Sequence, residues 1–150
     1  MDLKFRVFAH VSKPVETVFE AVADPDQLSH YFTTGGAKGR LETGATVTWD
    51  FHDFPGAFPV DVIEVVPNQR IVLEWQANDK ADRPYKTRVV MSFEAVESDR
   101  TLVAIEESGW HETESGTEAA FGNCMGWSQM LCALKMWVEH GINLREEMYK

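Results

Sequence analysis

Residues 117–140, near the C-terminus, most constrain the fold because their sequence predicts one long helix. Ser115 followed by Glu118 has the spacing of a capping box, which predicts the start of the helix. Gly141 tolerates a positive φ just past the predicted end, where Ile142 can fold back on Trp137. At about 1.5 Å per residue such a helix is about 37 Å long, enough to cross a small domain. We therefore expect the other elements to be arranged around it.

The predicted helix has two apolar faces. At about 100° per residue, the wider face is expected to be buried, and it comprises Ala120, Cys124, Trp127, Met130, Leu131, Leu134, Trp137 and Val138. A second stripe lies on the opposite side and consists of Phe121, Met125, Cys132 and Met136. Exposed apolar rows often mark an interaction surface, so the stripe predicts a homodimer or a contact with a client protein. The alternative is that the short helices or residues 143–150 cover it.

The rest of the chain predicts a strand, two short helices and about six more strands. Residues 3–8 alternate with the period of a strand, whereas residues 14–32 have helical spacing that is interrupted at Asp24-Pro25. Residues 47–110 form short alternating runs joined by turn residues. Such runs form an antiparallel sheet with one packed face, which the long helix can cover. The predicted fold class is α+β, a helix-grip arrangement of about six or seven curved antiparallel strands wrapped around the C-terminal helix.

Composition and charge exclude several classes of partner. A chain of 150 residues with 44% hydrophobic residues has the size of one domain with a substantial core. The formal net charge of −10 repels nucleic acid and anionic membranes. The chain has neither the apolar run of a signal peptide nor one long enough to cross a bilayer. Cys124 and Cys132 are too far apart on one helix for a disulfide. We expect a single cytoplasmic domain, spanning residues 1–150, that binds neither nucleic acid nor membranes.

Glu107 is the clearest candidate for a buried functional group. It follows Val103 and Ile105 by steps of two on one predicted strand, so it points at the helix if those residues are buried. Burial of a carboxylate is costly unless the group pairs, stays protonated or contacts a ligand, and burial raises its pKa. Glu107 is therefore a candidate ligand anchor or general acid. A strand-end carboxylate paired with a surface cation is the alternative.

Glu64 is a second candidate, on the predicted strand 60–66. It points inward if Val62 and Val66 do. The opposite register, with Ile63 and Val65 inward, fits the sequence about equally well, so we leave the direction of Glu64 open.

A group of apolar side chains could line a pocket of the kind that binds small apolar molecules. For each of them an ordinary place in the core is the alternative. They are Tyr31, Phe32, Trp49, Phe51, Trp75, Met91, Phe93, Trp127, Met130, Leu131 and Leu134. The sequence contains no HExxH, CxxC or Gly-x-x-x-x-Gly-Lys motif, so we expect neither a metal nor a cofactor, and we assign no catalytic residue.

Three stretches resemble the helix-grip (SRPBCC) superfamily, which includes the birch pollen allergen and START lipid-transfer domains. They are residues 62–75, Glu107-Ser-Gly-Trp110, and Gly126-Trp127 with Leu131 and Leu134. Within the superfamily the chain is most similar to the group named for the activator of the heat-shock-protein-90 ATPase. The resemblance spans nearly the whole chain and implies a cavity between helix and sheet, used for apolar ligands in some members and for catalysis in a few. Co-chaperone activity belongs to members with an additional N-terminal domain, which we do not expect in this chain.

Three functions are therefore considered. The first is the binding of a small apolar or aromatic molecule between sheet and helix, with Glu107 and Glu64 setting its orientation. The second is an enzyme of the polyketide cyclase or hydrolase type, which needs at least two convergent titratable groups. The third is a chaperone-associated interaction module that uses the stripe on the long helix.

Overall fold

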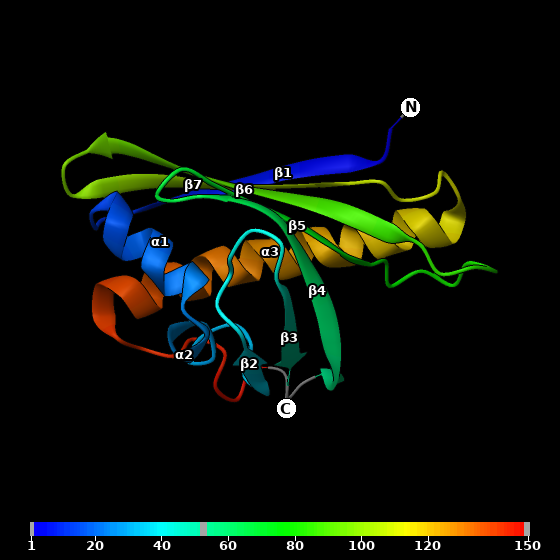
Figure 1. The fold of residues 1–150 in the computed structure, drawn as a ribbon, viewed down its shortest axis with the longest axis horizontal. Helices are drawn as coiled ribbons and strands as arrows, with labels where there is room; N and C mark the ends of the chain where they lie inside the picture. The colour runs from blue at the N-terminus through cyan, green and yellow to red at the C-terminus, as the bar shows by residue number, and fades with distance from the viewer. Residues whose placement is uncertain (1, 52–53, 149–150) are drawn as a thin grey trace.

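A computed structural model describes residues 2–51 and 54–148 of the chain (Figure 1). Within these residues it contains one antiparallel sheet, two short helices and one long helix. In chain order the elements are β1 (Lys4–Val11), α1 (Val15–Ala23), α2 (Pro25–Leu28), β2 (Gly36–Lys38), β3 (Thr46–Phe51), β4 (Phe54–Val66), β5 (Arg70–Gln76), β6 (Lys86–Glu97), β7 (Arg100–Ser108) and α3 (Glu114–His140). The predicted fold class and the position of the two short helices are confirmed.

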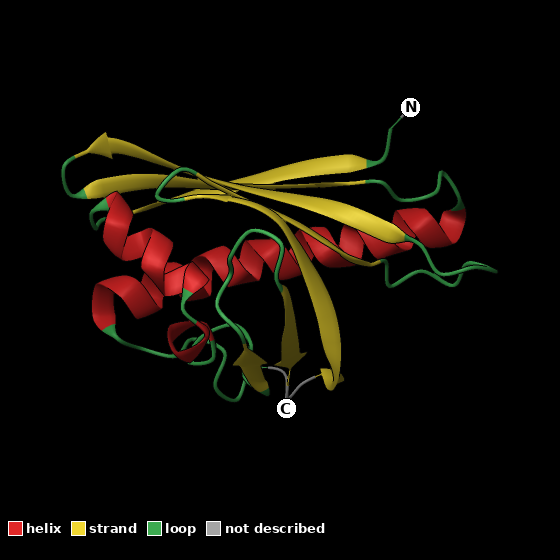
Figure 2. Cartoon of the chain, in the orientation of Figure 1, coloured by secondary structure: helices red, strands yellow, loops and turns green. Residues whose placement is uncertain are grey.

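The sheet has the strand order β1-β7-β6-β5-β4-β3-β2, and every neighbouring pair is antiparallel. Figure 2 shows α3 running along one face of the sheet, while β3 and β4 bend away from the plane of the other strands. The bend leaves the inner face concave. The C-terminal tail returns from the end of α3 toward the ends of β2 and β3 (Figure 1).

The core fills the space between α3, α1 and the inner face of the sheet. On β6 and β7 the buried residues follow each other by steps of two, for example Met91 and Phe93, or Val103 and Ile105. From α3, the residues that are buried against them include Trp127, Met130, Leu131 and Leu134. No helix in the described part of the chain combines the length and the apolar composition needed to cross a membrane.

The C-terminal end of α3 agrees with the prediction from the sequence, whereas its N-terminal cap differs. Gly141 is the C-cap, with φ 68°, and its N–H donates to the carbonyl oxygens of Met136 and Trp137. The predicted capping box at Ser115 is wrong, because the helix begins at Glu114 and the Thr113 hydroxyl accepts the N–H of Gly116 at 3.0 Å. Two hydroxyl residues stand close together here, and the cap is the one that keeps an extended backbone.

Glu64 points away from the core, which decides the register that the sequence left open. Val60 and Val62 are buried, and a β-bulge between Val62 and Glu64 then changes the alternation of the strand. Glu64 instead lies on the surface and forms an ion pair with Arg70, whose Nε donates to Glu64 Oε1 at 2.9 Å. Glu64 therefore does not point into the space between the sheet and α3.

Candidate ligand pocket

Glu107 lies at the centre of a hydrogen-bond network that joins three strands to the long helix. Its side chain is fully buried, with 0% exposed. The Nε1–H groups of Trp75 and Trp127 donate to its oxygens at 3.1 and 2.7 Å, and the Thr87 hydroxyl lies 2.6 Å from one of them. The Asn123 side-chain amide donates to both oxygens, at 3.1 and 3.0 Å. The inward direction predicted for Glu107 is confirmed.

The four partners of Glu107 are uncharged, so none of them supplies a cation to offset its burial. Burial raises the pKa of Glu107 above its ordinary value of 4.5, and the hydrogen bonds from Thr87, Trp75, Trp127 and Asn123 oppose this shift only in part. Indole and amide N–H groups can only donate, whereas a hydroxyl can donate or accept. Thr87 is thus the partner that suits both states, as donor to the carboxylate or acceptor from the carboxyl O–H.

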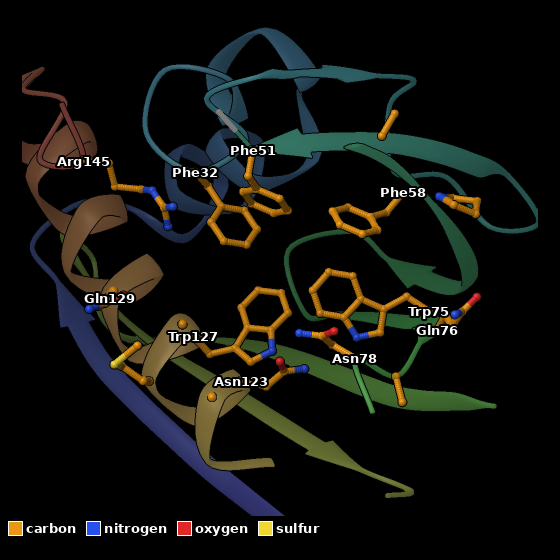
Figure 3. A pocket seen from close by; sticks show the side chains of 16 residues that line it. Phe32, Phe51, Phe58, Trp75, Gln76, Asn78, Asn123, Trp127, Gln129 and Arg145 are labelled. Carbon is orange, nitrogen blue, oxygen red and sulfur yellow. The ribbon is translucent and has the colours of Figure 1, made fainter. Parts of the chain in front are cut away.

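A pocket of about 740 Å³ lies beside this network, between α3 and strands β3, β4 and β5 (Figure 3). Trp75, Asn123 and Trp127 belong both to the network and to the wall of the pocket. Glu107 itself does not reach the pocket surface, because these three side chains separate it from the open space. The pocket has five aromatic residues in its wall: Phe32, Phe51, Phe58, Trp75 and Trp127.

The aromatic side chains pack against one another as a continuous wall. The ring of Phe32 lies 5.0 Å from that of Phe51 and 5.3 Å from that of Trp127, measured between ring centroids. The Trp127 and Trp75 rings are 5.5 Å apart, and the Phe51 and Phe58 rings are 6.2 Å apart. Pairs at these separations are each worth about 0.5–1.5 kcal/mol beyond the burial of their surface. The wall is thus held together before any ligand enters.

Two glycines leave room for the pocket on the helix side. Gly122 and Gly126 lie one turn apart in the wall of the pocket, and a Cβ added at either would meet no atom within 4 Å. The residues that follow them, Asn123 and Trp127, are also one turn apart and both reach Glu107. The helix backbone at the two glycines therefore faces the cavity, while the side chains of Asn123 and Trp127 face the Glu107 carboxylate.

Arg145 supplies a positive charge to the pocket from the tail that follows α3. The residue is 5% exposed. Its Cζ lies 6.0 Å from the ring centroid of Phe32 and 5.9 Å from that of Phe51, within the range of cation–π attraction. Its backbone N–H donates to Asn143 Oδ1 at 3.1 Å, which fixes the turn that carries it.

The residues predicted to line a pocket fall into two groups. Phe32, Phe51, Trp75 and Trp127 do line it. The others lie in the core, where the sheet, α1 and α3 are in contact, and the Tyr31 hydroxyl there donates to the Ala21 carbonyl oxygen at 2.9 Å. The core group comprises Tyr31, Trp49, Met91, Phe93, Met130, Leu131 and Leu134. Within the described residues, no three His, Cys, Asp or Glu side chains are placed to hold a metal.

The stripe predicted on the outer side of α3 is largely exposed. Phe121 is 72% exposed and Met125 is 60% exposed, Cys132 is exposed as well, and Met136 is partly buried. The short helices and the tail therefore leave most of it open within the described chain. Met125 also forms part of the pocket wall, so the stripe and the pocket meet at this residue.

Sequence reasoning missed the polar residues of the pocket, which are Gln76, Asn78, Asn123, Gln129 and Arg145. Asn123 had a usable signal, because it precedes Trp127 by one helical turn and so shares its face. The Gly122 and Gly126 pair was a second signal, since glycine inside a helix is unfavourable without a packing or functional reason. Arg145 had none, because residues 143–148 show no periodic pattern.

The raised pKa of Glu107 predicts a dependence of stability on pH. Since the folded protein binds this proton more tightly than the unfolded chain, the stabilising contribution is complete below about pH 4.5 and is lost as the pH rises through the folded-state pKa. We predict that the free energy of unfolding of the wild type, relative to that of Glu107→Gln, falls across this interval and is constant above it. Urea unfolding of both proteins between about pH 4 and pH 8 measures the difference. A difference that does not change with pH would contradict the prediction.

Comparisons with known proteins agree with this architecture. Among solved structures, protein SSP2350 from Staphylococcus saprophyticus is 28% identical, with a TM-score of 0.76 over 97% of this chain and 96% of its own. DynU16, a putative protein in the dynemicin biosynthetic locus, is 24% identical, with a TM-score of 0.77 over 94% of this chain and 49% of its own. The Aha1 dimer from Colwellia psychrerythraea is 22% identical, with a TM-score of 0.74 over 92% of this chain and 97% of its own.

The likenesses to DynU16 and to the Aha1 dimer show the fold alone. No curated protein matches the sequence. The family model described as "Activator of Hsp90 ATPase homolog 1-like protein" matches residues 12–139, from the end of β1 to the last turn of α3. Because the match covers most of the chain, the protein belongs to the activator of Hsp90 ATPase homolog 1-like family.

Proposed function

We propose that this protein binds a small apolar or aromatic molecule in the pocket between α3 and strands β3, β4 and β5. The observation that carries the proposal is the pocket of about 740 Å³ with five aromatic residues in its wall. This volume lies within the range of ligand sites in proteins, which are mostly apolar with a few placed polar groups. The amides of Gln76, Asn78, Asn123 and Gln129 are such groups.

Glu107 acts in this proposal as a positioning residue rather than as a direct ligand anchor. Both of its oxygens accept hydrogen bonds from the side chains of Trp75, Asn123 and Trp127. The indole N–H groups are thereby turned toward the carboxylate, so each ring can present its apolar surface to a ligand. Orientation of the ligand by Glu107 is thus indirect, through the two indoles.

Binding is better supported than acid–base catalysis. Arg145 is the only charged side chain among the described residues that line the pocket. A cyclase or hydrolase of the kind considered from the sequence needs at least two convergent groups that exchange protons. Glu107 is separated from the pocket space by its own partners.

Filling the pocket from the helix side tests the proposal. Because a Cβ at position 126 meets no atom within 4 Å, a leucine there can project into the pocket without displacing the core. We predict that the wild type binds the neutral dye N-phenylnaphthylamine with saturable, one-to-one stoichiometry, and that Gly126→Leu weakens this binding by about tenfold or more. Fluorescence titration of the dye measures both affinities.

Gly126→Ala is the matched control for this variant. It removes the same helix glycine and adds about 0.5–1 kcal/mol of stability through helix propensity, but it fills little of the pocket. Its affinity for the dye should stay within about threefold of the wild type. Absence of dye binding to the wild type, or equal affinities of all three proteins, would contradict the proposed function.

A second proposal concerns the stripe on α3, which we infer to be the contact surface of a homodimer. Phe121 and Met125 are among the most exposed large apolar side chains of the described chain. Contiguous exposed apolar surface of this kind is typical of protein contacts. The structural neighbour from Colwellia psychrerythraea is described as a dimer, which supports a second copy of this chain as the partner.

Sedimentation equilibrium at micromolar concentration tests the dimer. We predict a dimeric wild type and a monomeric Phe121→Glu/Cys132→Glu variant, because two buried carboxylates on each copy would oppose association. Met125 is left unchanged because it also lines the pocket. Phe8→Glu is the control, since Phe8 is 59% exposed and lies on the face of β1 opposite to Val7 and Ala9, which pack against the core; this variant should stay dimeric. A monomeric wild type would contradict the proposal.

A further inference from the structure

Asn123 is an amide of the pocket wall whose orientation is fixed. Its Nδ2 donates to both oxygens of Glu107, at 3.1 and 3.0 Å. An acceptor holds the N–H side of an amide, so the carbonyl oxygen of Asn123, Oδ1, is turned away from Glu107. The side chain is half-buried and lines the pocket, and within the described part of the chain Oδ1 accepts no hydrogen bond. This oxygen is therefore open to a ligand.

The side-chain donors beside Asn123 are already used by Glu107. The Nε1–H groups of Trp75 and Trp127 both donate to the carboxylate, and an indole has no other polar group to offer. Figure 3 shows Asn123 next to the Trp127 ring. The other amides of the wall have no side-chain hydrogen bond among the described residues, so each can turn to present an oxygen or an N–H group; they are Gln76, Asn78 and Gln129. At Asn123, by contrast, the wall presents an acceptor.

Asn123 also lies where the aromatic pocket meets a more polar space. A smaller surface hollow of about 330 Å³ shares Asn78, Gly122 and Asn123 with the pocket. The other residues that line this hollow are mostly polar: Lys80, Ser115, Glu118 and Ala119. A ligand with its rings in the aromatic pocket therefore has its polar group at Asn123, on the border between the two spaces.

We propose that Asn123 selects an aromatic ligand that carries a hydrogen-bond donor, such as the O–H of a phenol or the N–H of an aromatic amine. The ligand donates this group to Asn123 Oδ1, and its rings lie against Trp75 and Trp127. This inference rests on the proposed binding function and adds the functional group of the ligand and its place in the pocket. Glu107 contributes as a positioning residue, because it holds the amide with its oxygen outward.

Two naphthalenes that differ in one donor test the role of Asn123. 2-Naphthol carries an O–H group, and 2-methoxynaphthalene keeps the ring system and the oxygen but has no donor. We predict that the wild type binds 2-naphthol about tenfold more tightly, because only the O–H can pair with Asn123 Oδ1. Isothermal titration calorimetry at about pH 7, where a phenol is un-ionised, gives both dissociation constants.

Asn123→Leu removes the acceptor and keeps a side chain of similar size. This variant should bind the two naphthalenes with affinities within about twofold of each other. Its affinity for 2-methoxynaphthalene should stay within about threefold of the wild type, which a loss of folding would not allow. Gln69→Leu is the matched control, because Gln69 is exposed in the turn between β4 and β5, outside the pocket, and this variant should keep the tenfold preference.

A carbon-13 measurement on the wild type tests the contact without any substitution. A hydrogen bond accepted by Asn123 Oδ1 draws electrons from the side-chain carbonyl and moves its ¹³Cγ signal downfield. We predict this shift at saturation with 2-naphthol and its absence with 2-methoxynaphthalene, whose rings are the same. Equal responses to the two ligands would contradict the proposal, and this measurement decides the matter if Asn123→Leu does not fold.

The outcomes separate this inference from the function on which it rests. If the dye N-phenylnaphthylamine binds but 2-naphthol does not, or binds no better than 2-methoxynaphthalene, the inference is overturned and the binding function stands. A preference that survives in Asn123→Leu would also overturn it, because another acceptor would then receive the O–H group. Failure of the dye and both naphthalenes to bind the wild type would overturn the binding function, and the inference with it.

Discussion

The burial of the Glu107 carboxylate is the constraint on which the rest of this structure depends. A carboxyl group without solvent is costly, by several kcal/mol, unless hydrogen bonds replace the lost water. Here the donors come from Trp75 on β5, Thr87 on β6, and Asn123 and Trp127 on α3, while Glu107 itself is on β7. One side chain thus fixes the position of the helix relative to three strands. A shift of α3 by one turn would leave the carboxylate without half of its partners.

The pocket follows from that fixed position. Once Asn123 and Trp127 are held at Glu107, the glycines that precede each of them lie against open space between α3 and the bent strands β3 and β4. The bulges in β3–β4 and β4–β5 pairing turn these strands around the end of the cavity. Network and cavity share Trp75 and Trp127, so the Glu107 carboxylate is bonded directly to two side chains of the pocket wall.

Sequence patterns predicted the parts of the molecule that are governed by strict periodicity. The long helix, the antiparallel sheet and the inward direction of Glu107 each follow from a repeat of 3.6 or 2 residues. The direction of Glu64 does not, because one extra residue at a bulge reverses the alternation and has no signal in the sequence. Trp49 and Trp75 each belong to a run in which apolar and polar residues alternate, yet Trp49 lies in the core and Trp75 in the wall of the pocket. The curvature of the sheet, which the sequence does not reveal, gives the two tryptophans different surroundings. Arg145 reaches the pocket through a tail whose sequence has no periodic pattern.

The indole N–H signals of Trp75 and Trp127 offer the most direct measurement of the Glu107 network. Two-dimensional ¹H–¹⁵N spectra recorded across a pH series follow both groups at once. If one carboxylate accepts both N–H groups, the two signals shift with a single shared midpoint above 4.5, and this shift is absent in Glu107→Gln. Separate midpoints, or a shared shift that persists in Glu107→Gln, would show that Glu107 does not join strand and helix beside the pocket.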